Sequence, residues 1–242
     1  MVESQKRANQ DWQQVVGLIT GHSMKLYHFT TREYGLKNIR HRRLKIARIN
    51  ELNDPFEFLG VASTSATVRK RYSALKSGLS DYMGVLCFSE SWHNPVQWSH
   101  YAEHHKGLCL CFEIDENVHD IRKVNYVERR LKAKPGHLDG YSPKAIKHML
   151  EILTTKFLHW QYEQEHRVFP KLDAPEGSGL YFFKFENGLI LKEVIIGHRS
   201  TVTRSELREA LGSHAASVKC TKARLAFQTF GVVAQKKSAL WK

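Results

Sequence analysis

Short apolar runs bounded by turn-forming residues recur along the chain, and they predict more strands than helices. A strand covered on both faces needs no polar alternation, so near-continuous apolar runs indicate buried strands. Two such runs are GVLCFSE (84–90) and LCLCFEI (108–114), and GLYFFKFE (179–186) and LILKEVIIG (189–197) are also predicted to be strands. Further strands are expected at KLYHFT (25–30), LKIARI (44–49), 122–127 and 223–230.

Helix signals are fewer and more widely spaced. Thr30 or Thr31 can cap a short helix over REYGLKNIRHR (32–42), and Thr203 with Glu206 forms a capping box before another. Helices are also expected at 66–79, at 94–107, where a proline precedes and a glycine follows, and from Pro143 to about Trp160, the longest of the set. Residues 1–23 are predicted to form a helical N-terminal extension.

The order of these elements favours an α+β fold. Strands often follow one another directly, whereas a doubly wound α/β fold would alternate strands and helices. The chain has 242 residues, which suits one sizeable domain. We therefore expect a single α+β domain over residues 24–242, with mixed or antiparallel sheets flanked by helices.

Composition narrows the setting of the protein. No apolar run approaches the ~20 residues of a membrane helix, and the polar N-terminus lacks the apolar segment of a signal peptide. Three of the four cysteines, Cys87, Cys109 and Cys111, lie in apolar runs, and Cys220 lies in a polar one. This pattern argues against a disulfide framework and favours a cytoplasmic protein without a membrane partner.

The chain is strongly basic, with 37 lysines and arginines against 24 acidic residues and a formal net charge of +13. Such a surface attracts polyanions through contacts with phosphate groups, which makes nucleic acid a candidate partner. A general basic bias that keeps the protein soluble explains the same charge. No recognition motif for nucleic acid is visible, so charge alone supports this inference.

The stretch HWQYEQEHRV (159–168) places Glu163, Glu165 and Arg167 at every second position. In a strand these three side chains emerge on one face. They form either a salt-bridge ladder or a binding site. The sequence contains neither a phosphate-binding glycine loop nor a nucleophile elbow, so no rival catalytic motif competes with this stretch.

Other polar positions are weaker candidates. His28 lies on a predicted strand between two aromatic residues, and LNDPFE (52–57) places Asn53 and Asp54 in a turn or at the rim of a pocket. A zinc site from four further side chains is conceivable, although the cysteines among them lie in a run that is expected to be buried. These four are His100, His104, Cys109 and Cys111. We expect no metal.

Several stretches together resemble a bacterial family catalogued only as a domain of unknown function, number twenty-nine seventy-one. They are LYHFTTREYGLKNI, INELNDPFE, GVLCFSESWHNPVQWSHYAEHHKGLCLCFE, KFLHWQYEQEHRVF and LKEVIIG, and they span roughly residues 25–200. That family carries no settled activity, so this resemblance implies no function directly.

A histidine strand, a central Ser/Tyr segment and a late glutamate strand follow the order of the ADP-ribosyltransferase superfamily, which the chain also resembles. The opening LYHFTTREYGLKNIRHRRL is similar to that of its nucleic-acid-directed toxins. The resemblance implies NAD as a substrate, with His28 on a ribose and Tyr101 or Ser89 at the nicotinamide ribose or ring. Glu165 would be the catalytic carboxylate, and Glu163 would complete a Glu-x-Glu pattern.

Four more residues are expected at the NAD site on the same basis: Trp98, Asn53, Asp54 and Arg167, the last on a phosphate or keeping the carboxylates ionised. Trp98 and Tyr101 depart from the superfamily pattern, because they fall on a predicted helix rather than a central strand.

The leading functional hypothesis is an ADP-ribosyltransferase-like toxin or phage-defence effector that acts on nucleic acid and has a cognate inhibitor or partner protein. It requires His28 and Glu165 to meet in one pocket. One alternative is a non-catalytic nucleic-acid-binding module, with its charges scattered over the surface. Another is a nuclease that uses Asp54, Glu163 and Glu165.

Overall fold

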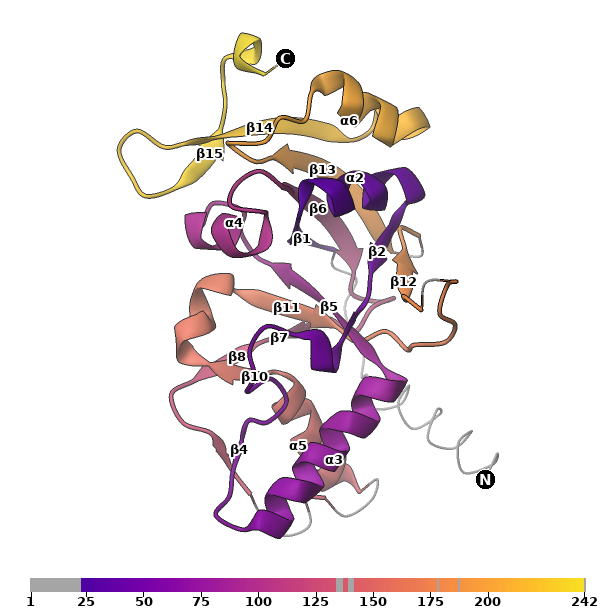
Figure 1. Ribbon diagram of the computed structural model, residues 1–242, viewed down its shortest axis with the longest axis vertical. Coiled ribbons are helices and arrows are strands. Elements are labelled where there is room, and N and C mark those ends of the chain that lie inside the picture. The colour runs from indigo at the N-terminus through magenta and orange to yellow at the C-terminus, as the bar shows by residue number, and fades with distance from the viewer. Residues whose placement is uncertain (1–22, 134–136, 139–141, 178, 187, 242) are drawn as a thin grey trace.

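The computed structural model describes residues 23–133, 137–138, 142–177, 179–186 and 188–241 (Figure 1). The helical extension expected at residues 1–23 lies outside them, apart from Ser23, which begins the first strand. Within the described ranges, no helix is both long and apolar enough to cross a membrane.

A curled mixed sheet runs through the molecule in the strand order β15-β14-β13-β6-β1-β5-β11-β7 (Figure 1). Its long strands match the apolar runs of the sequence: β1 (Ser23–Thr30), β5 (Gly84–Ser89), β6 (Leu108–Asp115) and β13 (Leu189–Ile196). Shorter members are β7 (Arg122–Lys123), β11 (Glu165–Val168), β14 (Lys219–Leu225) and β15 (Val232–Ala234). β13 and β14 are parallel to each other, and the other neighbours in this order are antiparallel.

Helices cover the two ends of this sheet. At one end α2 (Arg32–His41) packs beside α6 (Arg204–Leu211), and Thr31 and the Thr203–Glu206 capping box start them as expected. At the other end lie α3 (Ala66–Tyr82) and α5 (Pro143–Leu153), joined by a contact between the Tyr72 hydroxyl and His148. The short α4 (Pro95–Tyr101) packs beside β1 (Figure 1).

The architecture confirms the α+β prediction. The largest apolar core lies between the sheet and helices α2 and α6, and includes Leu110, Phe112 and Val194. A second core under α3 and α5 contains Phe58, Tyr72 and Ile152. All four cysteines are free thiols, with Cys109 and Cys111 buried inside β6.

Two predicted strands are each divided in two, and a third is shifted. The expected strand at 44–49 is split into β2 (Arg43–Lys45), which pairs with β12 (Phe182–Lys184), and β3 (Ala47–Arg48), which pairs with β5. The strand at 122–127 is split into β7 and β8 (Asn125–Val127). In both divided strands the two halves pair with different strands. The strand expected at 223–230 begins earlier, at Lys219, and ends at Leu225 as β14, which forms a hairpin with β15.

The longest predicted helix was placed wrongly. α5 ends at Leu153 rather than near Trp160, and α3 is longer, with 17 residues against 11. Strand β10 (Thr155–Phe157) follows and pairs in parallel with β8, and a 3-10 helix, η2 (Leu158–Glu163), leads into β11. Tertiary pairing therefore overrides the helical pattern from residue 155 onward.

The remaining elements are short. β4 (Val61–Ala62) pairs with β9 (Leu131–Lys132), and a 3-10 helix, η1 (Ile49–Glu51), follows β3. The 3-10 helices η3 (Gly212–His214) and η4 (Ser238–Leu240) lie near the C-terminal end of the described chain.

Candidate functional site

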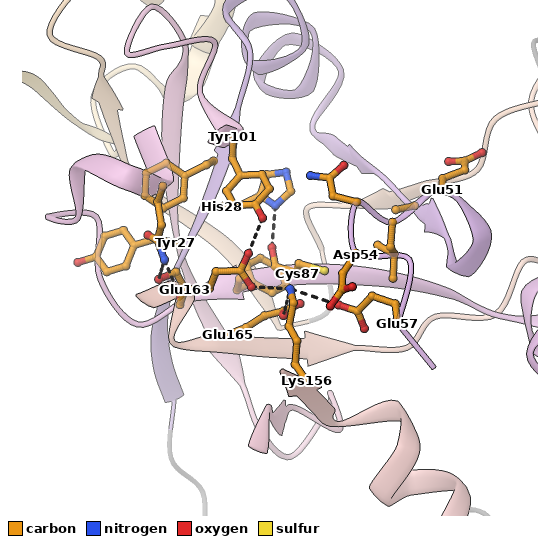
Figure 2. Close-up of a pocket in the computed structure, with 17 residues that line it drawn as sticks. Tyr27, His28, Glu51, Asp54, Glu57, Cys87, Tyr101, Lys156, Glu163 and Glu165 are labelled. Carbon is orange, nitrogen blue, oxygen red and sulfur yellow. Dashed lines mark hydrogen bonds and ion pairs between the residues drawn. The ribbon is translucent and has the colours of Figure 1, made fainter. Parts of the chain in front are cut away.

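A cavity of about 260 Å³ opens where strands β1, β5 and β11 meet the loop that follows β3 (Figure 2). Seven of the sequence-predicted site residues line it. They are His28, Asn53, Asp54, Ser89, Tyr101, Glu163 and Glu165. The residues expected to meet in one pocket do so, although they are up to 137 positions apart in the chain.

The cavity exists because β1 and β5 separate along their length. They pair at Tyr27 and Ser89 only, and farther along β5 the strand β3 takes the place of β1 at Val85. The Cys87 carbonyl lies between these two pairings, and His28 Nδ1 lies 3.0 Å from it. The imidazole therefore occupies the gap that the separating strands leave.

The bond to Cys87 also fixes the state of His28. A carbonyl oxygen can only accept a hydrogen bond, so Nδ1 carries the proton and Nε2 remains an acceptor. Burial lowers the pKa of His28, and the bond to Cys87 offsets this only in part. The neutral ring thus keeps one acceptor nitrogen for a ligand in the cavity that it lines.

The two glutamates reach the cavity in different ways. Glu165 lies on β11 opposite Ser89 of β5, as a strand residue. Glu163 ends η2, and Gln164 between them is left-handed, with φ 46° and ψ 52°. Strand geometry therefore holds from residue 165 onward and not at Glu163, yet Glu163 and Glu165 bond the same ammonium group.

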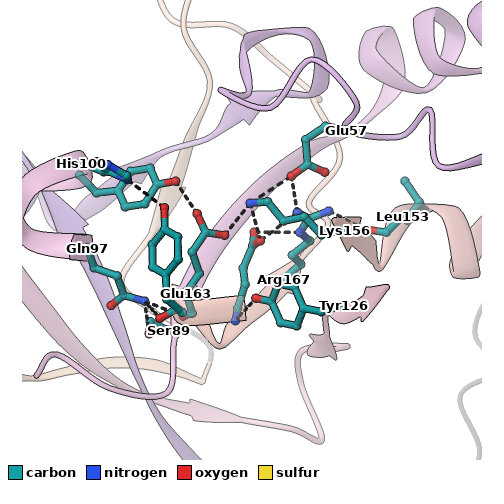
Figure 3. A network of polar contacts seen from close by, with 12 residues as sticks. Glu57, Ser89, Gln97, His100, Tyr126, Leu153, Lys156, Glu163 and Arg167 are labelled. Atoms are coloured by element: carbon teal, nitrogen blue, oxygen red, sulfur yellow. Dashed lines mark hydrogen bonds and ion pairs between the residues drawn. The ribbon is translucent and has the colours of Figure 1, made fainter. Parts of the chain in front are cut away.

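That ammonium group belongs to Lys156 on β10, and it lies among three carboxylates (Figure 3). Lys156 Nζ lies 2.5 Å from Glu163, 3.2 Å from Glu165 and 3.2 Å from Glu57. All four side chains are less than a tenth exposed. Because the dielectric constant is low there, these pairings are strong and the loss of one partner is costly.

Arg167 contacts two of these carboxylates, Glu165 and Glu57, and is completely buried. Its Nε lies 2.8 Å from Glu165 Oε1, and one terminal nitrogen lies 2.9 Å from Glu165 Oε2 and 2.7 Å from Glu57 Oε1. The other terminal nitrogen donates to the Leu153 carbonyl. Arg167 is not among the residues that line the cavity, so it is not placed to bond a ligand phosphate there; its contact with Glu165 instead helps to lower the pKa of that carboxyl group.

The surroundings separate the pKa values of the two glutamates. Burial alone would raise the pKa of Glu165, but Arg167 and Lys156 outweigh it and lower that pKa to about 2. For Glu163 burial prevails over Lys156, and its pKa is raised above the ordinary value. Glu165 therefore stays ionised, and Glu163 is the better proton acceptor.

Tyr101 of α4 holds Glu163 from above by donating its hydroxyl hydrogen to Glu163 Oε1. Burial and the neighbouring Glu163 raise the pKa of Tyr101 far above its ordinary value, so the phenol remains a donor. Gln97, one turn earlier, donates to Ser89 Oγ and to the Glu163 carbonyl. Helix α4 thus holds both the backbone and the carboxylate of Glu163. Tyr101 therefore reaches the cavity although it lies on a helix and not on a central strand.

Gln97 also has an acceptor that no described residue uses. The side chain is 2 % exposed and lines the cavity, and its Oε1 accepts no hydrogen bond within the described chain. A buried carbonyl oxygen without a donor is costly. A ligand with an amide N–H would satisfy it.

Two groups of predicted residues lie away from the cavity. Trp98 was expected at the NAD site, but it is fully buried behind it and donates to the Trp92 carbonyl at 2.6 Å. The possible zinc pair His100 and His104 shares no helix face, because α4 ends at Tyr101 and His104 has φ 53°. No group of three or more metal-ligating residues occurs in the part of the chain that is described.

Asp54 lies in the cavity wall, where its Oδ1 accepts from the Phe56 amide at 2.9 Å in a local turn. The turn interpretation and the pocket-rim interpretation of this residue are therefore both correct. The nearby carboxylates bond Lys156 and Arg167, which supply the positive charge that a nuclease site would take from metal ions.

The sequence interpretation missed Lys156, Gln97 and Cys87. Lys156 falls inside the stretch that was assigned to the helix 143–160, and its nine-residue separation from Glu165 follows no helix or strand period. The only sequence feature that could have indicated a buried ion pair was the single lysine in TTKFLHW, and it is a weak signal. Gln97 lay in the helix that was predicted, without a pattern to distinguish it.

Comparisons of the chain with family models, curated proteins and solved structures find no match. The resemblance to the domain of unknown function and to the ADP-ribosyltransferase superfamily therefore stays a prediction. The pocket geometry provides the argument for function.

Proposed function

We propose that this protein is an NAD-dependent ADP-ribosyltransferase-like enzyme, working as a toxin or phage-defence effector on nucleic acid. The observation that carries the proposal is the convergence of His28, Glu163 and Glu165 on one cavity. An ADP-ribosyltransferase-like site requires His28 and Glu165 to share one pocket. A simple binding module would carry its charges scattered over the surface, whereas Glu163 and Glu165 are buried and line one cavity.

The cavity suits the nicotinamide-ribose part of NAD. Its volume of about 260 Å³ is at the lower end of small-molecule sites, so it would hold one part of the dinucleotide. Gln97 Oε1 would accept from the nicotinamide amide, and His28 Nε2 would accept from a ribose hydroxyl. Lys156 and Arg167 are engaged with glutamates and would not reach the diphosphate.

The separated pKa values divide the work between the two glutamates. When the bond from ribose C1′ to nicotinamide breaks, its electron pair leaves with the ring and positive charge develops on the ribose. Glu165, ionised because of Arg167 and Lys156, supplies fixed negative charge at that centre. The acceptor atom bonds to C1′ in the same step as nicotinamide departs, and the proton of the acceptor passes to Glu163.

The test uses NAD labelled in its adenylate phosphate, with single-stranded DNA, RNA and protein offered as separate acceptors. Wild type should transfer label to one nucleic acid, and Glu163→Gln should transfer about 10²- to 10⁴-fold more slowly because it lacks the base. Glu113→Gln on the surface of β6 is the matched control and should match wild type. Folded wild type that neither transfers label nor consumes NAD would remove the proposal.

A further inference from the structure

A second cavity of about 250 Å³ adjoins the first and shares Asp54, Glu57 and Lys156 with it. Its remaining walls come from three places: the loop after η1, the segment that follows β8, and strand β10. The residues are Phe56, Gly60, Val127, Glu128, Arg129, Arg130, Thr155 and Phe157. None of these was singled out from the sequence as a site residue.

Aromatic side chains and charged side chains of both signs line this second cavity, and one of its arginines lies beside one of its aromatic rings. Phe56 and Phe157 are 54 % and 43 % exposed, although both are phenylalanines. The Arg130 guanidinium lies 4.5 Å from the centre of the Phe56 ring. No carboxylate of the described chain pairs with Arg129 or Arg130, so both charges are free to meet an anion.

A buried acceptor also lies in the wall between the cavities. Glu57 is 3 % exposed, and its Oε1 is bonded by Arg167 at 2.7 Å and by Lys156 at 3.2 Å. Its Oε2 has no hydrogen-bond partner among the described residues. A carboxylate oxygen only accepts, so the group that would satisfy it is an N–H or O–H donor.

We propose that the second cavity binds one unpaired nucleotide of a single-stranded nucleic acid. The base stacks on the Phe56–Arg130 pair or on Phe157, since bases stack on guanidinium planes as well as on rings. Arg129 and Arg130 bind the flanking phosphates, and Glu57 Oε2 accepts a hydrogen bond from the base. A paired base could not enter a cavity of this kind, which is why the strand is single.

The location gives this nucleotide its role, and this part rests on the proposed function. The Lys156 ammonium group contacts both Glu57, in the wall of the second cavity, and Glu163, the proposed general base. The two cavities are therefore separated at this point by a single side chain. A nucleotide held there lies beside the site where NAD would be cleaved. It is therefore the acceptor, bound at the same time as NAD and not in its place.

Binding is measured by fluorescence anisotropy of labelled 12-nucleotide DNA and RNA homopolymers, without NAD. Phe56→Ala should raise Kd at least fivefold, because stacking on an aromatic side chain contributes strongly for each base. The double variant Arg129→Ala/Arg130→Ala should reduce the slope of log Kd against log salt by about 0.7 for each arginine. An abasic 12-mer should bind wild type as weakly as the homopolymer binds Phe56→Ala.

Matched controls lie at the other end of the sheet. Tyr34→Ala on α2 removes an aromatic ring of the same 54 % exposure, and Arg208→Ala on α6 removes one exposed charge. Both should bind as wild type does. Equal losses in Tyr34→Ala and Phe56→Ala, or equal binding of abasic and normal strands, would reduce the interaction to general charge attraction and overturn the inference.

Two further readouts separate this inference from the proposed function. Saturating NAD should not displace the oligonucleotide; competition by NAD or by ADP-ribose would assign the cavity to the donor and overturn the inference. Oligonucleotide binding that depends on Phe56, in a protein that leaves NAD intact, would support the nucleotide site while the transferase proposal fails. NAD cleavage without any oligonucleotide binding would give the reverse result.

Discussion

At the scale of single residues, the site is a buried set of charges whose balance depends on a proton. Glu57, Glu163 and Glu165 bring three carboxylates to two cations, Lys156 and Arg167. Because its pKa is raised, Glu163 is the carboxylate of this set that takes up a proton most readily, and that proton neutralises the excess negative charge. A carboxylate with a raised pKa accepts a proton more readily, which is what a general base needs.

Tyr101 tunes that proton, and its removal has a predictable sign. The Tyr101 hydroxyl donates to Glu163 and so favours the ionised carboxylate, which lowers its pKa relative to a site without the tyrosine. In Tyr101→Phe the pKa of Glu163 should rise further. The acid limb of the kcat/KM profile for NAD cleavage should therefore move to higher pH, with activity recovered at alkaline pH. A uniformly lower profile of unchanged shape would contradict this role.

Lys156 stabilises the fold as well as the site. Among the described residues, Lys156→Met would leave the buried Glu163 without a cation, because Arg167 pairs with the other two carboxylates of the cluster. Removing one partner of a buried ion pair typically costs about 3–5 kcal/mol in the free energy of unfolding. The exposed ion pair of Lys192 with Glu113 offers the control, and Lys192→Met should cost less than about 1 kcal/mol. Urea unfolding measures both, and similar values for the two variants would show that the cluster is not strongly coupled.

At the scale of elements, the passage from α5 to β11 determines whether Glu163 reaches the cavity. Gln164 carries a left-handed backbone there, with φ 46°, and its amide closes the 3-10 turn on Gln161. A β-branched residue tolerates that conformation poorly. Gln164→Val should thus lose about 1–2 kcal/mol of stability, and Gln164→Gly should lose none. Gln161→Val in η2 controls for side-chain change; equal losses at the two positions would refute the strain.

The same passage shows what the sequence could and could not predict. The period of two correctly placed Glu165 and Arg167 on one face, because β11 spans both of them. The helical spacing of apolar residues continued past Leu153, but Thr155–Phe157 instead pair with Asn125–Val127, 30 positions earlier. No local pattern announces that pairing. Lys156 was missed for the same reason, since its partners are fixed by the parallel strands and not by its neighbours.

At the scale of the whole molecule, one irregularity in the sheet creates the site. β5 is shared between β1 and β3 on the same edge, and the cavity opens between those pairings. The alternation and apolar runs predicted the strands themselves and the α+β class. They could not predict that β1 and β5 would separate, because strand order and divergence depend on pairing between distant segments.

The arrangement of the cations indicates which part of the net charge of +13 can attract nucleic acid. The cations nearest the glutamates, Lys156 and Arg167, are buried and paired, so they do not draw a polyanion to the surface. Exposed arginines beside the second cavity do so in our account. Affinity for nucleic acid should therefore depend on salt through Arg129 and Arg130 more than through arginines elsewhere.

The most direct test of the central claim is the rate of nicotinamide release from NAD by wild type and Glu163→Gln, both verified as folded by circular dichroism. We predict turnover by wild type in the presence of single-stranded nucleic acid. We predict a rate at least about 100-fold lower for Glu163→Gln, with NAD binding retained because His28 and Gln97 are intact. Absence of nicotinamide release by wild type, or equal release by both proteins, would contradict the account.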